Sequence, residues 1–302
     1  MLGLENFSFL AVWHPIVMLF VLGLIFVYLW VTEKGRHHFS ESEPVPRKKQ
    51  VSFVVGMVLL YLTQAGPLNL LGHLTFTAHM AAMAISYLLA PPLILYGLPA
   101  WLLRPFTRDQ WFQRYGKKLL HPVFTILFFN MSFSIYHMPV IYDFVMTHFV
   151  LHTLYHLLLL VAAMMMWWPI FSPLPEFSSL THLKKMGYMF LNGVLLTPAC
   201  ALIIFASEPL YKTFTDPLMW AQKMAYCVPG GVQDVLEQFS GPDQFSPLSA
   251  RHDQQLGGVL MKLMQETIYG SILFYIFNQW YRTEKGDDED TNEVVSSQLN
   301  QA

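Results

Sequence analysis

Long apolar segments, each close to the length of a membrane-spanning helix, recur along the chain and are separated by polar loops. A helix that crosses the hydrocarbon core of a bilayer needs about 20 mainly apolar residues. The pattern predicts an all-α integral membrane protein, a seven-helix bundle that occupies residues 1–282. The predicted spans are 12–31, 52–71, 76–97, 122–138, 148–169, 186–206 and 256–277. The second is interrupted by Gly66-Pro67, and the short fourth contains Asn130.

Lysine and arginine are concentrated in the segments that follow the first, third, fifth and seventh predicted spans. The positive-inside rule therefore predicts an N-terminus outside and a C-terminus in the cytoplasm. The outer segment 207–255 is long and rich in proline and glycine, which predicts a lid. The acidic segment 283–302 is expected to be a disordered, solvated tail. No basic stretch precedes the first span and no cleavage site follows it, so we expect a retained helix and not a signal peptide.

Composition narrows the function classes further. The chain of 302 residues is 54% hydrophobic and 13% charged, with a formal net charge of −2. These values exclude a basic nucleic-acid binder and a disordered scaffold. Cys200 and Cys227 are too few for a disulfide framework, although a single bridge or a soft metal ligand stays open. The sequence contains no hydrolase elbow, phosphate-binding glycine loop or H-E-x-x-H helix, so we expect no enzyme.

Histidines are found mainly in the outer halves of the predicted spans. His79, His152 and His156 are expected at least one turn inside the membrane, where ionisable groups are costly and usually face the bundle interior. His148, His152 and His156 follow a spacing of four, which places them on one face of the fifth span. Other outer histidines, which lie nearer to water, are expected to be solvated or to cap helices: His14, His73 and His252.

Three predicted helices thus offer imidazole and thioether groups at similar depth. Imidazole binds copper, zinc, iron and nickel, whereas thioether selects Cu(I). The pattern favours a copper site and leaves a zinc site open. Packing is the alternative role for the methionines, and interhelical hydrogen bonding is the alternative for the histidines. The candidate ligands are His79, Met80, Met83, His137, His152 and His156.

Several other polar or bent positions fall in or beside the spans. Asp253 is predicted to cap its own helix, or to serve as a metal ligand or as a partner that orients an imidazole. Lys262 and Glu266, four residues apart, are expected to form an ion pair. Pro91-Pro92 and Pro198 are expected to kink their helices.

Two rival functions are compatible with these residues. His79 opposite His152 or His156 would suit a membrane b-type cytochrome with bis-histidine haem. Lys262 and Glu266 would suit a proton-coupled, polar-lined transporter. The chain has no detectable internal repeat, which disfavours a transporter built from two inverted halves.

The arrangement of short motifs along residues 10–280 resembles the CtaG family of cytochrome c oxidase assembly factors of Gram-positive bacteria. The resemblance rests on several motifs that occur in order at the expected spans. They are Trp13-His14-Pro15, His79-Met80, Ala90-Pro91-Pro92-Leu93, His137-Met138-Pro139, Tyr142-Asp143, Leu151-His152, His156, Trp167-Trp168-Pro169, Asp253-Gln254-Gln255 and Gly257-Gly258.

The resemblance implies a seven-helix bacterial plasma-membrane protein that helps to assemble haem-copper oxidases by supplying or inserting copper. It assigns the family's histidines to His79, His137, His152 and His156, and its acidic motif to Asp253 and Gln254. Expected partners are the oxidase subunit that carries the copper centre, an extracytoplasmic copper donor and the lipid bilayer, with a homodimer left open. This chain has Met83 where many members have a second histidine, a change that would either favour Cu(I) or reduce the contribution of this helix to the site.

Overall fold

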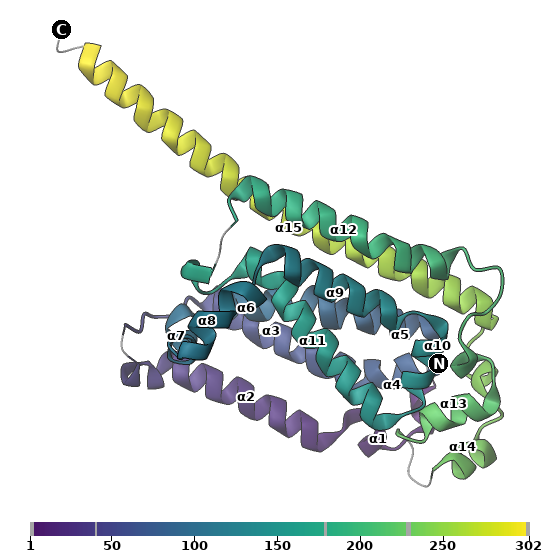
Figure 1. Ribbon diagram of the computed structural model, residues 1–302. Coiled ribbons are helices and arrows are strands. Elements are labelled where there is room, and N and C mark those ends of the chain that lie inside the picture. Colours follow the sequence, from purple (N-terminus) through teal and green to yellow (C-terminus); the bar gives the residue numbers. More distant parts are fainter. Residues whose placement is uncertain (1–2, 40, 178–179, 228–230, 300–302) are drawn as a thin grey trace.

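The computed structural model describes residues 3–39, 41–177, 180–227 and 231–299 (Figure 1). These residues form helices joined by loops and contain no strand. The all-α class predicted from the sequence is therefore confirmed.

Five helical segments are long and apolar enough to cross a membrane, and a bent helix pair adds a sixth if it forms one span. The bent pair comprises α8 (Gln110–Leu119) and α9 (Pro122–Tyr136), which meet at 70°. The fourth and seventh predicted spans are not among these five segments. The fourth corresponds to α9, which has only 15 residues, and the seventh lies in α15, which carries the charged Lys262 and Glu266. The count of seven spans thus stays a prediction. The five segments are Phe9–Glu33, Arg47–Leu74, Phe76–Gly97, Phe149–Phe171 and His182–Ile204.

Two of these spans contain an irregular segment at or just before a proline that the sequence analysis identified. The second divides at Gly66 into α3 (Arg47–Gln64) and α4 (Pro67–Leu74). The third consists of α5 (Phe76–Ala84), a π-helical turn (Ile85–Leu89) and α6 (Ala90–Gly97). Pro91 explains the π turn, because proline has no N–H to donate to the carbonyl four residues earlier, and that carbonyl belongs to Tyr87.

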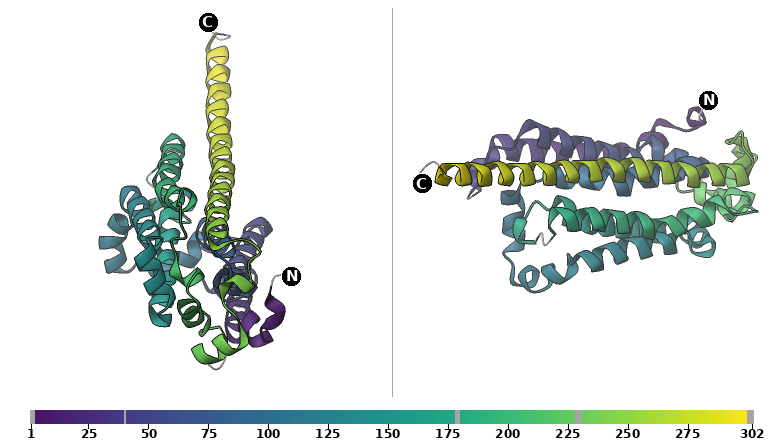
Figure 2. Two further views of the ribbon diagram at one scale, coloured as in Figure 1. Left: turned by 90° about the vertical axis from the view of Figure 1, so that its right-hand side faces the viewer. Right: turned by 90° about the horizontal axis from the view of Figure 1, so that it is seen from above.

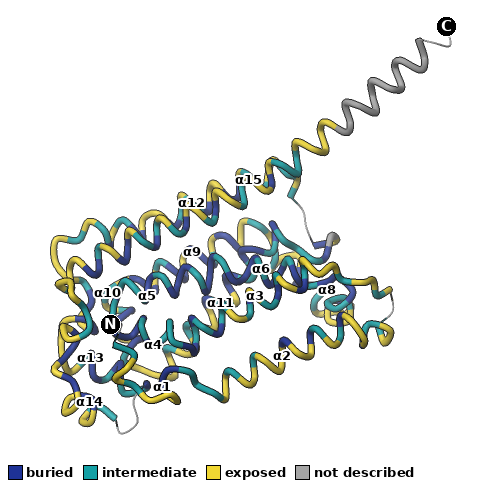
Figure 3. Tube along the Cα trace, turned by 180° about the vertical axis from the view of Figure 1, so that it is seen from behind, coloured by how far each residue is buried: buried dark blue, intermediate teal, exposed yellow. Residues whose placement is uncertain are grey.

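The core of the bundle lies among α5, α6, α9, α11 (Phe149–Phe171), α12 (His182–Ile204) and α15 (Ala250–Leu299). α12 and α15 lie side by side along most of the bundle (Figure 1). α2 (Pro15–Glu33) follows the short α1 (Phe9–Trp13) at the periphery and packs mainly against α3. Its outward face is exposed and apolar, as in Ile16 and Phe26, which is the surface expected to contact lipid (Figure 3).

The predicted lid lies at one end of the bundle. It contains η5 (Lys212–Phe214), α13 (Pro217–Met224), α14 (Val232–Gln238) and η6 (Pro242–Gln244). The N-terminal turn η1 (Leu4–Asn6) lies at the same end, where Phe7 stacks on Phe239 with ring centroids 5.4 Å apart. α10 (Pro139–Met146) joins α9 to α11 beneath the lid.

The basic segments lie at the opposite end, in η2 (Gly35–His38), α7 (Ala100–Thr107), α8 and the first residues of α12, which the loop with η4 (Pro175–Phe177) precedes. This separation is compatible with the predicted orientation across the membrane, which stays a prediction. Beyond the bundle, α15 continues as a helix to Leu299 (Figure 2). An isolated helix is only marginally stable in water, so the expected disorder of the tail in solution also stays a prediction.

Candidate functional site

A small cavity beneath the lid collects most of the candidate histidines. It has a volume of about 10 Å³ and lies between α3, α4, α5 and α11. A cavity of this size holds about one water molecule or one ion. We call it the histidine cavity. The lining side chains that could bind a metal ion are those of His73, His79, Met83, His152 and His156. No carboxylate lines it, so neutral imidazole, the form that binds metals, is favoured there.

His79 reaches the cavity from the first turn of α5. Its side chain is buried, and its Nε2 has no hydrogen-bond partner within the described part of the chain. Gly72 permits this approach, because a Cβ atom at Gly72 would lie 3.1 Å from the Cα of His79. A larger residue at position 72 would therefore push α4 away from α5.

Asp253 fixes the start of the same helix. Its Oδ2 accepts a hydrogen bond from the Phe76 amide at 2.6 Å, and its Oδ1 accepts one from the Thr77 amide at 3.2 Å. These are free amides at the N-terminus of α5, so the carboxylate caps a helix distant in sequence. The prediction that Asp253 caps its own helix is wrong, because α15 begins at Ala250, before Asp253.

His156 is held between two tyrosine hydroxyls. Its Nδ1 lies 2.9 Å from the hydroxyl of Tyr87, and its Nε2 lies 3.1 Å from that of Tyr136. A neutral imidazole has one N–H and one lone pair, so the two hydroxyls satisfy it completely. Tyr87 is itself fixed, because Trp167 donates its indole N–H to the Tyr87 carbonyl at 3.1 Å.

His73 and His152 face each other across the cavity, with ring centroids 5.5 Å apart. The Nδ1–H of His73 donates to the Asn69 carbonyl at 2.9 Å, which leaves the lone pair on Nε2. The His152 and His156 rings are 4.2 Å apart, as their spacing of four predicts. The expectation of a solvated or capping His73 is wrong, since the lid packs over α4 and buries it.

His137 is buried, but it does not line the histidine cavity. Its Nδ1–H donates to the Phe133 carbonyl at 2.7 Å, and its Nε2 has no partner among the described residues. The ring contacts Tyr136, which His79 and His156 also contact. His137 is thus a neighbour of the site with a free lone pair.

The two candidate methionines and His148 lie in three different environments. Met83 lines the histidine cavity, whereas Met80 packs in the core close to Gly257, where a Cβ atom would lie 3.2 Å from its Cγ. His148 is exposed and donates through Nδ1 to the Phe144 carbonyl at 2.7 Å. It takes the solvated role that the sequence left open.

Over the described ranges, no three histidine, cysteine, aspartate or glutamate side chains approach closely enough to hold a metal ion. The histidine cavity therefore gathers imidazoles without a complete coordination sphere in this conformation. His73, His79 and His152 would have to move before all three could share an ion.

The lid contributes a buried lysine that the sequence analysis did not identify as a candidate. Lys223 of α13 is fully buried, its Nζ lies 3.3 Å from the ring centroid of Phe214, and no described atom forms a hydrogen bond with it. Burial lowers the pKa of Lys223 well below its usual value, and Asp143 and Asp253 only partly oppose this effect. Its only sequence signal is a single basic residue within a mainly apolar helix.

Asp143 anchors the lid in the same region. Its Oδ2 accepts from the Lys212 amide at 3.0 Å, and its Oδ1 accepts from the amide and hydroxyl of Thr213 at 3.0 and 2.9 Å. One carboxylate on α10 therefore holds η5 against the bundle. The family motif containing Asp143 thus has a structural role in this chain.

Two further predictions concern positions outside the cavity. Lys262 and Glu266 form the expected ion pair at 2.7 Å, and Lys262 also donates to the Thr197 hydroxyl at 2.8 Å. Cys200 and Cys227 are both buried and free, so they form no disulfide. Neither pair lines the histidine cavity.

Comparison with known proteins supports the family resemblance that the order of the motifs indicates. A family model described as cytochrome c oxidase caa3 assembly factor (Caa3_CtaG) matches residues 26–283. No curated protein and no solved structure matches the chain. The matched region includes the histidine cavity, the lid and all the helices that carry them, and the chain belongs to the cytochrome c oxidase caa3 assembly factor family.

Proposed function

We propose that this assembly factor binds copper in the histidine cavity and supplies it to a haem-copper oxidase that is being assembled. The observation that carries the proposal is the convergence of imidazoles from α4, α5 and α11 on one ion-sized cavity. Copper is the cargo of such a protein, and soft, incompletely formed sites suit a cargo that must leave again. Because the chain belongs to an oxidase assembly family, we take the oxidase to be the recipient of the copper.

The ligand set that we propose is His73, His79 and His152, with the thioether of Met83. His73 and His79 each have an Nε2 that makes no hydrogen bond to a described residue. His152 lies opposite His73 and makes no hydrogen bond through its ring to any described residue. The thioether of Met83 favours Cu(I) over the divalent metals.

The remaining candidates take supporting roles in this proposal. His156 stays between its two tyrosines and forms part of the cavity wall, and Asp253 fixes the start of α5. His137, which lies across Tyr136 from the cavity, is a second position for copper on its way to the partner. Met80 contributes to packing.

Direct measurement of Cu(I) binding tests the proposal. The full chain, purified in detergent without a polyhistidine tag, is loaded with Cu(I) in competition with a chromophoric chelator. We expect one tightly bound ion per chain, and a loss of at least tenfold in affinity in the His73→Ala/His152→Ala double variant. His148→Ala is the matched control, because this exposed histidine directly before α11 lies outside the cavity. Unchanged binding in the double variant would refute the site.

Oxidase assembly in cells provides the second readout. Cells that carry the double variant are expected to contain less active oxidase, and added copper is expected to restore part of that activity. An oxidase subunit that accumulates normally but lacks its copper would distinguish metal delivery from stabilisation of a half-built subunit.

Zinc is the competing cargo, because imidazoles suit it as well as copper. A Met83→Leu variant separates the two ions. We expect weaker Cu(I) binding and unchanged Zn(II) binding, since zinc makes little use of a thioether. Haem would require a far larger cavity than about 10 Å³, and a visible spectrum without a Soret band is expected.

A further inference from the structure

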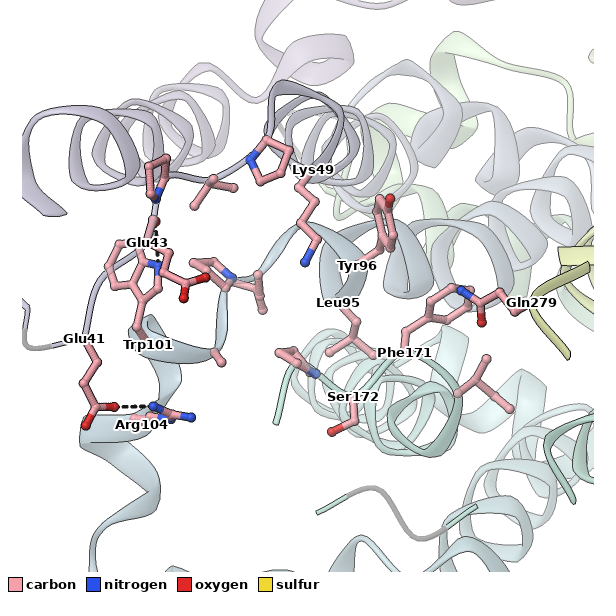
Figure 4. A pocket seen from close by; sticks show the side chains of 18 of the residues that line it. Glu41, Glu43, Lys49, Leu95, Tyr96, Trp101, Arg104, Phe171, Ser172 and Gln279 are labelled. Atoms are coloured by element: carbon pink, nitrogen blue, oxygen red, sulfur yellow. Dashed lines mark hydrogen bonds and ion pairs between the residues drawn. The ribbon is translucent and has the colours of Figure 1, made fainter. Parts of the chain in front are cut away.

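A large pocket opens at the end of the bundle opposite the lid, far from the histidine cavity. It has a volume of about 540 Å³ and is lined by the loop before α3, the end of α6, the start of α7 and parts of α11, α12 and α15. Figure 4 shows its polar side chains, which include Glu41, Glu43, Lys49 and Arg104. Lys185 lines it from α12. This is the end at which the basic segments gather.

An apolar groove adjoins this pocket. It has a volume of about 530 Å³ and lies between α3, α6 and α15. Its walls are almost entirely apolar, with Pro92 and Leu93 on one side and Ile268 and Ile272 on the other. Tyr96, Phe171 and Tyr275 line both cavities, so the polar pocket and the apolar groove form one continuous surface.

Two ammonium groups in the pocket lack an acidic partner. Arg104 is paired with Glu41, whereas Lys49 and Lys185 have no carboxylate within 4.0 Å in the described part of the chain. The Nζ of Lys49 points into the pocket and lies 5.8 Å from the ring centroid of Tyr96 (Figure 4). The Nζ of Lys185 donates one hydrogen bond, to the Ile170 carbonyl at 3.0 Å, and keeps two donors.

We propose that an anionic phospholipid with a hydroxyl-bearing headgroup occupies this surface. Its phosphate lies between Lys49 and Lys185, and one acyl chain follows the apolar groove toward the middle of the bundle. The ammonium groups compensate the phosphate charge, and the groove removes the chain from contact with water. Glu43, whose carboxylate has no hydrogen-bond or ion-pair partner among the described residues, accepts from the headgroup hydroxyls, which favours phosphatidylglycerol.

Lipid binding by the purified full chain tests this proposal. Native mass spectrometry measures the binding of phosphatidylglycerol and of phosphatidylcholine with the same acyl chains. We expect at least a tenfold preference for phosphatidylglycerol in the wild type. The Lys49→Gln/Lys185→Gln variant is expected to lose this preference. Lys117→Gln/Lys118→Gln, which removes two exposed lysines of α8, is the control and is expected to keep it.

Further measurements separate binding of the whole lipid from binding of its headgroup, and loss of the site from misfolding of the variant. Glycerol phosphate without acyl chains is expected to bind far more weakly than the lipid, and Leu93→Trp, which fills the groove, is expected to weaken phosphatidylglycerol binding. Lys49→Arg keeps the charge and is expected to keep the preference if the bundle is intact. Equal binding of both lipids by the wild type, or an undiminished preference in the Lys49→Gln/Lys185→Gln variant, would overturn the proposal. Binding of glycerol phosphate as tight as that of the lipid would also overturn it.

Discussion

Asp253 and Phe76 are 177 residues apart in the sequence, and the carboxylate of the first accepts a hydrogen bond from the backbone amide of the second at 2.6 Å. This contact joins the start of α15 to the start of α5, one turn before His79. The geometry of the histidine cavity therefore depends on a residue that contributes no atom to its walls.

Removal of this carboxylate is expected to weaken both the fold and the site. Asp253→Ala leaves two amides of α5 without their acceptor, which typically costs about 1–3 kcal/mol for buried donors. We expect a lower thermal unfolding temperature and weaker Cu(I) binding. Asp243→Ala, which removes an exposed carboxylate of η6, is the control. If the two variants unfold at the same temperature, Asp253 does not stabilise α5.

Neighbouring tryptophans offer a matched test of the π turn. Trp167 satisfies the Tyr87 carbonyl freed by Pro91, whereas the indole nitrogen of Trp168 is buried without a partner among the described residues. Trp167→Phe is expected to cost about 1–3 kcal/mol more than Trp168→Phe, because it leaves a buried carbonyl unsatisfied. Chemical unfolding of both variants measures the difference. A larger loss in Trp168→Phe would argue against this role of Trp167.

A pair of glycines tests how closely α4 must approach His79. A Cβ atom at Gly72 would lie 3.1 Å from the His79 Cα, whereas one at Gly187 would meet no other atom within 4 Å. Gly72→Ala is expected to destabilise the bundle and weaken copper binding. Gly187→Ala is expected to be neutral or to stabilise its helix by up to about 1 kcal/mol. Copper affinity that is unchanged in Gly72→Ala would show that the cavity tolerates a wider separation.

The buried lysine of the lid predicts a pH dependence of stability. Because burial lowers the pKa of Lys223, the folded chain releases a proton that the unfolded chain keeps up to about pH 10. Stability therefore rises with pH above the folded pKa, by at most about 1.4 kcal/mol per pH unit. Unfolding measured between pH 7.5 and 9.5 is expected to show a smaller rise in Lys223→Met than in the wild type.

A second lysine of the lid provides the control for this pH dependence. Lys212→Met, which removes an exposed lysine of the same lid, is expected to keep the wild-type slope. An equal slope in the wild type and Lys223→Met would mean that Lys223 does not titrate in this way. Lys223→Met is also expected to raise stability near neutral pH, because it removes a buried amine that has no hydrogen-bond partner within the described ranges.

Local sequence was sufficient to predict the helical class, the break at Gly66, an irregularity of the helix next to Pro91 and the Lys262–Glu266 pair. These features depend on local sequence: proline lacks an N–H, and residues four apart share a helix face. The family was also predicted, because its motifs are short and ordered along the chain.

The composition of the cavity wall could not be read from the sequence in the same way. His73 enters because α4 turns beneath the lid, and His137 is excluded because Tyr136 lies between it and the cavity. Asp253 caps a helix far away in the sequence, and Lys223 is buried by the lid. Each outcome depends on how helices distant in sequence pack together, which single-helix periodicity does not encode.

X-ray absorption at the copper edge of the Cu(I)-loaded, untagged chain tests the central claim most directly. The account predicts a low-coordinate site with two or three imidazole nitrogens and one sulfur, and a reduced nitrogen signal in the His73→Ala/His152→Ala variant. A site without imidazole, or an identical spectrum in that variant, would contradict it.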